Sequence, residues 1–127
     1  MTYRVLVVDD EAPIRNLLSA TFKKAGFAVL TAADVPEAMA RCSQEPFHVV
    51  LSDARMPGLS GHDLVRWLAV EHPATRTAMM SGCDLECSQC PFDARCSLLM
   101  KPFRPSEAVA LVHHLVSDAR SERTQAG

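Results

Sequence analysis

The sequence predicts an α/β fold, in which a doubly wound parallel sheet of five strands is covered on both faces by about five helices. Short runs rich in Val and Leu, typical of buried parallel strands, alternate with segments of helical apolar spacing. The chain has 127 residues, of which 48% are hydrophobic, enough for one domain with a substantial core and too few for two. We therefore expect one domain over residues 1–120 and a flexible tail over 121–127.

The first half of the chain carries three strand signals and two helix signals. The first helix is the clearest, because a proline lies in its first turn, Gly26 follows its end and its apolar residues recur at helical spacing. Asp34 is a suitable N-cap for the second helix. The apolar face of the first helix holds Ile14, Leu17, Leu18, Thr21 and Phe22. In order, the predicted elements are the strand Arg4–Val8, the helix Pro13–Ala25, the strand Phe27–Ala32, the helix from Val35 to about Ser43 and the strand Phe47–Leu51.

The second half continues the alternation after a turn at Met56-Pro57-Gly58. Pro73 ends the next helix, and the last helix has a buried stripe of Val and Leu residues. The predicted elements are the helix Gly61–Glu71, the strand Thr75–Met80, the strand Ser97–Met100 and a helix from Ser106 to about Arg120.

The segment between Ser81 and Lys101 does not follow the pattern. A helix of about three turns is expected before the fifth strand. Pro91 falls inside that segment, however, and the apolar periodicity is poor. We therefore predict that the fourth helix is short, distorted or replaced by a loop.

Acidic and basic residues stand where three of the predicted strands end. Asp9 and Asp10 follow the first strand, Asp53 follows the third and Lys101 follows the fifth. Because parallel strands end at the same edge of an open sheet, where ligands bind, we expect these side chains to converge. Three carboxylates and one amine carry a formal charge of about −2, which is costly to hold together without a divalent cation. The sequence therefore predicts a Mg²⁺ site built around one special aspartate.

These motifs, taken in order, resemble the receiver domain of two-component response regulators over about residues 3–117. The matching features are Asp9-Asp10 after the first strand, Asp53 followed by Met56-Pro57 and Gly61, Ser81 after the fourth strand, and Lys101-Pro102-Phe103 after the fifth. The resemblance implies a flavodoxin-like sheet with strand order 2-1-3-4-5. It also implies that the chain is a phosphoryl-accepting signalling domain and not an enzyme in its own right, beyond autophosphorylation from small donors and autodephosphorylation.

The resemblance assigns a role to each site residue. Asp53 is the implied nucleophile, which takes a phosphoryl group from a phosphohistidine of a sensor histidine kinase or a phosphotransfer protein. Asp10, Asp53 and the backbone carbonyl of Arg55 are expected to coordinate Mg²⁺ directly, and Asp9 through water, in keeping with the preference of this ion for oxygen ligands. Lys101 and Ser81 are expected to contact the phosphoryl oxygens. The Lys101-Pro102 peptide is expected to be cis, a form that proline makes accessible.

Two further expectations concern signal lifetime and read-out. Arg55 lies two residues after Asp53, near the path of an attacking water, so we expect it to influence the lifetime of the phosphoryl group. Receivers usually carry Tyr or Phe three residues before the lysine, and this chain has Leu98 there. The usual read-out to an unidentified downstream protein, through the surface of the fourth helix, fifth strand and fifth helix, is therefore in question.

A cluster of cysteines is the second departure from the family. Four thiols lie in the pattern Cys83-x3-Cys87-x2-Cys90-x5-Cys96, close after Ser81. Three interpretations stay open: a tetrahedral Zn²⁺ site or an iron–sulfur cluster, a reversible disulfide, or structural thiols on one face of a small helix. The first two define an alternative function, a metal- or redox-sensing receiver-like module in which this cluster is the primary sensor.

Composition and motifs exclude several other classes. A net charge of −2 and a pI near 6.2 give no reason to expect direct binding to nucleic acid or to a membrane surface. The chain shows no leader and no apolar stretch that could span a bilayer, so we expect a cytoplasmic protein. A flavodoxin would need a Ser/Thr-rich phosphate loop where Asp9-Asp10-Glu11 stand, and a haloacid-type phosphatase would need an aspartate where Arg55 stands.

Overall fold

The computed structural model describes residues 2–81 and 96–126, with the side chains of residue 96 and residues 118–126 left out. The described strands form one parallel sheet in the order β2-β1-β3-β4-β5, as the sequence and the family resemblance predict. The strands are β1 (Arg4–Val8), β2 (Ala28–Ala32), β3 (Val49–Asp53), β4 (Arg76–Ser81) and β5 (Cys96–Met100).

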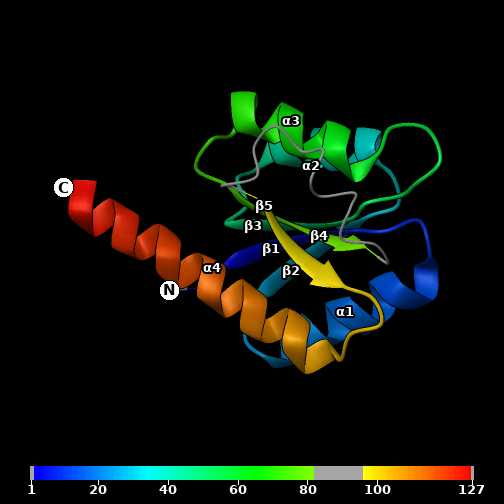
Figure 1. Cartoon of the computed structure of the whole chain (residues 1–127), viewed down its shortest axis with the longest axis horizontal. Coiled ribbons are helices and arrows are strands. Elements are labelled where there is room, and N and C mark those ends of the chain that lie inside the picture. The colour runs from blue at the N-terminus through cyan, green and yellow to red at the C-terminus, as the bar shows by residue number, and fades with distance from the viewer. Residues whose placement is uncertain (1, 82–95, 127) are drawn as a thin grey trace.

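The described residues form four helices, which cover the sheet on both faces (Figure 1). They are α1 (Ala12–Lys24), α2 (Val35–Gln44), α3 (Gly61–Glu71) and α4 (Pro105–Ala126). Alternate β1 residues pack into two separate cores, because successive strand side chains point to opposite faces. Val5 and Val7 join a core with α1 and α4, whereas Leu6 and Val8 join a core with α2 and α3.

Helix ends follow the local sequence. Asp34 caps α2 as predicted, because its side chain accepts a hydrogen bond from the Glu37 N–H at 2.8 Å. At the start of α3, Ser60 and Asp63 form a reciprocal capping box that sequence reasoning missed. Gly26, which follows the C-cap residue Ala25 of α1, takes a φ of 101°, a conformation that favours glycine.

Two sequence predictions need correction, and one falls outside the described residues. The last helix continues to Ala126 instead of ending near Arg120, because no glycine or proline interrupts the chain before Gly127. Leu17, which was predicted on the apolar face of the first helix, is 50% exposed. The predicted irregular segment that replaces a fourth helix lies within residues 82–95, which the structure does not describe.

The parallel register brings the carboxyl ends of the strands to one edge of the sheet. Val8 aligns with Ser52, Asp53 with Met80, and Ser81 with Met100. α4 begins near this carboxyl edge and runs back along the sheet, so the start of β1 and the end of α4 both lie toward the opposite edge (Figure 1). The carboxyl edge is where the predicted site residues meet.

Candidate functional site

Three carboxylates converge at the carboxyl edge of the sheet. Ligand oxygens of Asp9, Asp10 and Asp53 all lie within 4.8 Å of one another, with Asp9 and Asp53 buried and Asp10 exposed. Asp9 and Asp10 follow β1, and Asp53 is the last residue of the neighbouring strand β3. The convergence predicted from the ends of the strands is confirmed.

Asp9 is the most deeply buried member of the set. Its N–H donates to the Ala32 carbonyl at 3.1 Å, and its Oδ1 accepts from the Glu11 N–H at 2.9 Å. Its Oδ2 is buried and has no hydrogen-bond partner within the described part of the chain. Burial, with a further contribution from the nearby Asp53 charge, raises the pKa of Asp9 to about 6.

Lys101 supplies the opposite charge. Its Nζ lies 3.2 Å from Oδ1 of Asp53, in an ion pair whose carboxylate is almost fully buried. Lys101 follows β5, two strands away from β3, so the pair crosses over the end of β4. The backbone fixes this position as well, because the Lys101 N–H donates to the Ser81 carbonyl at 2.7 Å. The Lys101-Pro102 peptide is cis, as predicted.

The remaining predicted residues lie around this core of charges. Ser81 is buried at the end of β4, beside the position where Lys101 enters the site. Arg55 is exposed, two residues after Asp53. Leu98, on β5, packs against a small cluster formed by Ala54, Val65 and Met79.

The cysteines are only partly described. Cys83, Cys87 and Cys90 lie outside the described residues, and Cys96 is described only by its backbone in β5. The fifth cysteine, Cys42, lies on the buried face of α2, and burial raises the pKa of its thiol to about 11. Cys42 therefore stays protonated near neutral pH and acts as a small apolar core residue.

Gly61 lets helix α3 approach the end of β3 closely. A Cβ at this position would lie 2.5 Å from the Asp53 backbone oxygen and 3.1 Å from the Ala54 Cα. The Gly61 N–H also donates to the Ala54 carbonyl at 3.1 Å. The sequence motif contained this glycine, but sequence alone did not give the close contact that explains it.

The oxygen donors present suit a Mg²⁺ ion. The ion prefers carboxylate and carbonyl oxygens, usually one or two carboxylates with several waters. The buried Asp9 Oδ2 has no hydrogen-bond partner among the described residues and lies close to two further carboxylates, and this is the observation that fits a cation here. Three carboxylates beside one lysine leave an excess of negative charge that a divalent ion would neutralise.

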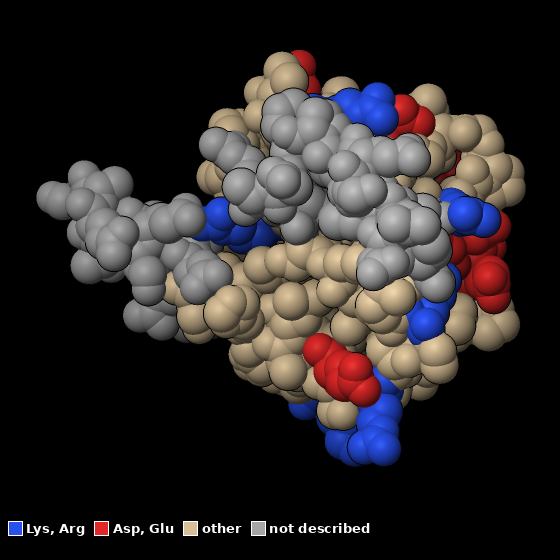
Figure 2. Space-filling view, viewed as in Figure 1, with Lys and Arg blue, Asp and Glu red and all other residues tan. Residues whose placement is uncertain are grey.

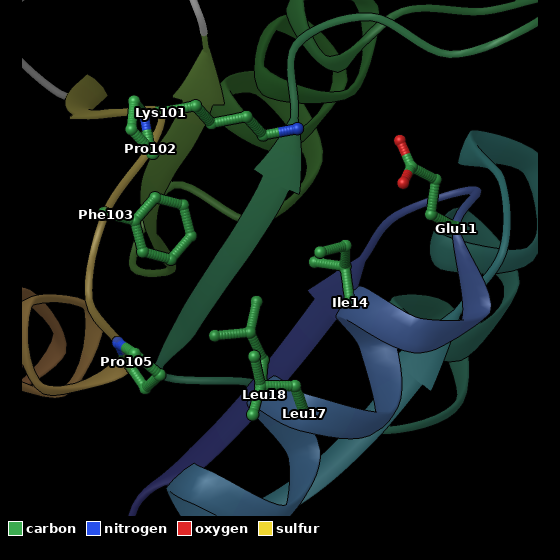
Figure 3. Close-up of a pocket in the computed structure, with 8 residues that line it drawn as sticks. All are labelled: Glu11, Ile14, Leu17, Leu18, Lys101, Pro102, Phe103 and Pro105. Atoms are coloured by element: carbon green, nitrogen blue, oxygen red, sulfur yellow. The ribbon is translucent and has the colours of Figure 1, made fainter.

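An apolar hollow of about 450 Å³ adjoins the charged site between α1 and the connection from β5 to α4 (Figure 3). Ile14 and Leu17 lie on one side of it, and Phe103 and Pro105 lie on the other. Lys101 lines the hollow and also pairs with Asp53, so the two features are continuous. Sequence reasoning missed this hollow, because it forms between segments that are far apart in the chain.

Charged side chains on the face seen in Figure 2 are mixed in sign. Acidic and basic surfaces lie close together at its right-hand edge, where Figure 1 places the beginning of α1. Asp10 and Glu11 are exposed at this end of the helix. The described residues contain no helix long and apolar enough to cross a membrane.

Comparisons with known proteins agree with this arrangement. The model of the response regulator receiver domain family matches residues 5–113. The chain is 32% identical to the DNA-binding transcriptional regulator NtrC of Salmonella typhimurium, over 94% of this chain and 26% of NtrC. It is also 32% identical to the transcriptional regulatory protein AruR of Pseudomonas aeruginosa, over 100% of this chain and 54% of AruR. The chain thus spans about a quarter to a half of the length of these two relatives.

Solved structures give the same answer for the fold. The chemotaxis response regulator CheY4 of Vibrio cholerae superposes with a TM-score of 0.81 at 29% identity, covering 91% of this chain and 99% of CheY4. A CheY-like response regulator receiver domain protein from Methanospirillum hungatei superposes with a TM-score of 0.90 at 25% identity, covering 96% of this chain and 99% of that chain.

Proposed function

Since the chain belongs to the family of response regulator receiver domains, we propose that it accepts a phosphoryl group on Asp53 in a Mg²⁺-dependent reaction. The donor is a phosphohistidine of a histidine kinase or a phosphotransfer protein. The observation that carries the proposal is the convergence of three carboxylates with Lys101, which is paired with Asp53 at 3.2 Å. Receiver domains are signalling domains, so the modification is the signal and not a step in turnover.

Each residue has a defined part in this reaction. An Asp53 carboxylate oxygen attacks phosphorus, the phosphorus–nitrogen bond of phosphohistidine breaks, and the imidazole leaves with the bonding electron pair. Asp10, Asp53 and the Arg55 carbonyl would hold Mg²⁺, with Asp9 acting through water. When bound, the ion supplies positive charge that offsets the charges of the carboxylates and the phosphoryl oxygens.

Lys101 and Ser81 would receive the phosphoryl oxygens. Lys101 already lies against Asp53, so its ammonium can move from the carboxylate to a phosphoryl oxygen over a short distance. Ser81 is buried at the neighbouring strand end and would donate its hydroxyl to another oxygen. Arg55 is exposed beside the nucleophile, and we expect its side chain to influence how long the acyl phosphate survives.

The test uses acetyl phosphate and Mg²⁺. The parent chain should gain one phosphoryl group by intact mass, and Asp53→Asn should gain none, because an amide oxygen is a poor nucleophile at phosphorus. Omitting Mg²⁺ should abolish the gain. Labelling of another residue, or no labelling even with a histidine kinase known to phosphorylate related receivers, would contradict the proposal.

The apolar hollow is the best surface for the protein that brings the phosphoryl group. The donor must approach Asp53 from the carboxyl edge, and the hollow opens beside Lys101 at that edge. Leu17 is 50% exposed there, an apolar surface that the docked donor would cover. We expect the donor to dock in the cytoplasm, where we also expect the phosphohistidine domain of the kinase to lie.

A further inference from the structure

Arg15 reaches from helix α1 back to the loop that carries the acidic pair. Its Nη1 donates to the backbone carbonyl of Asp9 at 2.7 Å. The short distance indicates a strong, charge-assisted hydrogen bond. Nothing in the roles described above requires this residue.

The accepting carbonyl belongs to the peptide group that joins Asp9 to Asp10. A peptide group is planar, so the direction of its carbonyl fixes the direction in which the backbone continues from Asp9 to Asp10. The backbone N–H of Asp9 donates to the Ala32 carbonyl, and its side-chain Oδ1 accepts a hydrogen bond from the Glu11 N–H. The Arg15 bond therefore fixes the one link that sets the position of Asp10 relative to Asp9.

We propose, on the basis of the phosphoacceptor function above, that Arg15 is a positioning residue for the Mg²⁺ site. It holds the peptide between Asp9 and Asp10 so that both carboxylates face Asp53 before the ion arrives. Groups that orient metal ligands in this way typically change metal affinity by about tenfold or more when they are removed.

The sign of the effect separates this role from simple electrostatics. A guanidinium near a cation site repels the cation, so its charge alone should weaken Mg²⁺ binding. Removing a residue that acted only through its charge would therefore strengthen binding. Removing a positioning residue should weaken binding despite the loss of the positive charge.

The experiment measures Mg²⁺ affinity by titration calorimetry of the whole chain at neutral pH. Arg15→Met keeps the aliphatic stem and removes the donor, and it should bind Mg²⁺ about tenfold more weakly than the parent. Lys23→Met removes the same charge from the far end of the same helix and should bind like the parent. With acetyl phosphate, Arg15→Met should need about tenfold more Mg²⁺ for its half-maximal rate, while its rate at saturating Mg²⁺ stays close to that of the parent.

Three results would overturn the inference. Arg15→Met could bind Mg²⁺ as tightly as the parent or more tightly, which would leave no positioning role. Its metal-free melting temperature could fall far below that of Lys23→Met together with the affinity, which would make the role general stability. A parent chain that bound no Mg²⁺ would overturn both this inference and the proposed function, whereas either of the first two results, with Mg²⁺ bound by the parent, would remove the inference alone.

Discussion

Burial of the Asp9 carboxyl links the stability of the metal-free fold to pH. Burial raises its pKa from 3.8 to about 6. Between these values the folded chain holds a proton that the unfolded chain releases, so stability falls as pH rises through this window. At about 1.4 kcal/mol per pH unit, ionised Asp9 costs the metal-free fold about 3 kcal/mol at neutral pH.

Asp9→Asn should therefore stabilise the metal-free chain. At pH 7 the gain in free energy of unfolding should be about 1–3 kcal/mol, the lower values applying if the buried amide finds no partner. The gain should shrink as the pH falls and approach zero only below the unfolded pKa of 3.8, where the Asp9 carboxyl is protonated in both the folded and the unfolded chain. Denaturant unfolding of both chains in a chelator measures this, and a gain that does not change with pH would contradict it.

The contact between α3 and the end of β3 holds the backbone of Asp53 in place. Gly61→Ala would force a Cβ to within 2.5 Å of the Asp53 oxygen, so the helix or the strand end must shift. We expect a net loss of stability of about 1–3 kcal/mol, because the gain in helix propensity is small at this first helical position. Phosphorylation of Asp53 by acetyl phosphate should also slow.

Ser60→Ala is the matched control for this prediction. It removes the capping side chain of the same helix and should cost about 1 kcal/mol, but it adds no atom near Asp53. Its phosphorylation rate should equal that of the parent. If Gly61→Ala matched Ser60→Ala in both stability and phosphorylation rate, the close approach of α3 to the end of β3 would not matter for the site.

The hollow beside α1 can be separated from the chemistry of Asp53. Leu17→Asp should slow transfer from the histidine kinase that phosphotransfer profiling identifies, because a charge would enter the apolar contact. We expect at least a tenfold loss with that kinase and little change with acetyl phosphate, which needs no docking surface. Val70→Asp, on α3 and 73% exposed, should leave both rates unchanged. Equal loss with both donors would place the defect in the site and not in docking.

Native intact mass can show what the cysteine cluster binds. Of the three interpretations that stay open for Cys83, Cys87, Cys90 and Cys96, we test first the one in which the anaerobically purified chain carries Zn²⁺ or an iron–sulfur cluster. Native intact mass should show the bound metal, Cys87→Ser should lose it, and Cys42→Ser should retain it, because Cys42 is a buried core thiol. The mass of the reduced, metal-free chain would favour structural thiols, and a mass lower by two hydrogens would favour a disulfide.

Sequence reasoning succeeded for elements whose signal is local. The strands were predictable because their apolar runs are short and bounded, and the acidic residues were predictable because each follows such a run. The exposure of Leu17 and the reach of Arg15 were not predictable, because they depend on which segments surround the start of α1. The end of α4 was missed because a polar, interruption-free sequence marks no stop.

For the whole molecule, the position of the site follows from the order of the strands. β1 lies next to β3, but the helix after β1 packs on one face and the helix after β3 packs on the other. The two connections therefore diverge at the carboxyl edge, and in open α/β sheets this is the place where ligands bind. Asp9 and Asp53 lie on either side of this divergence, so the fold itself provides a place for the proposed ion and phosphoryl group.

The two ends of the described chain lie toward the amino edge of the sheet, away from Asp53 (Figure 1). This arrangement matters for engineering. A fluorescent protein or an affinity tag joined at either end would be held away from Asp53, so both labelled forms should remain open to a phosphoryl donor. A pair of fluorophores placed at the two ends would report on that edge alone, and a third label near α1 would be needed to follow events at Asp53.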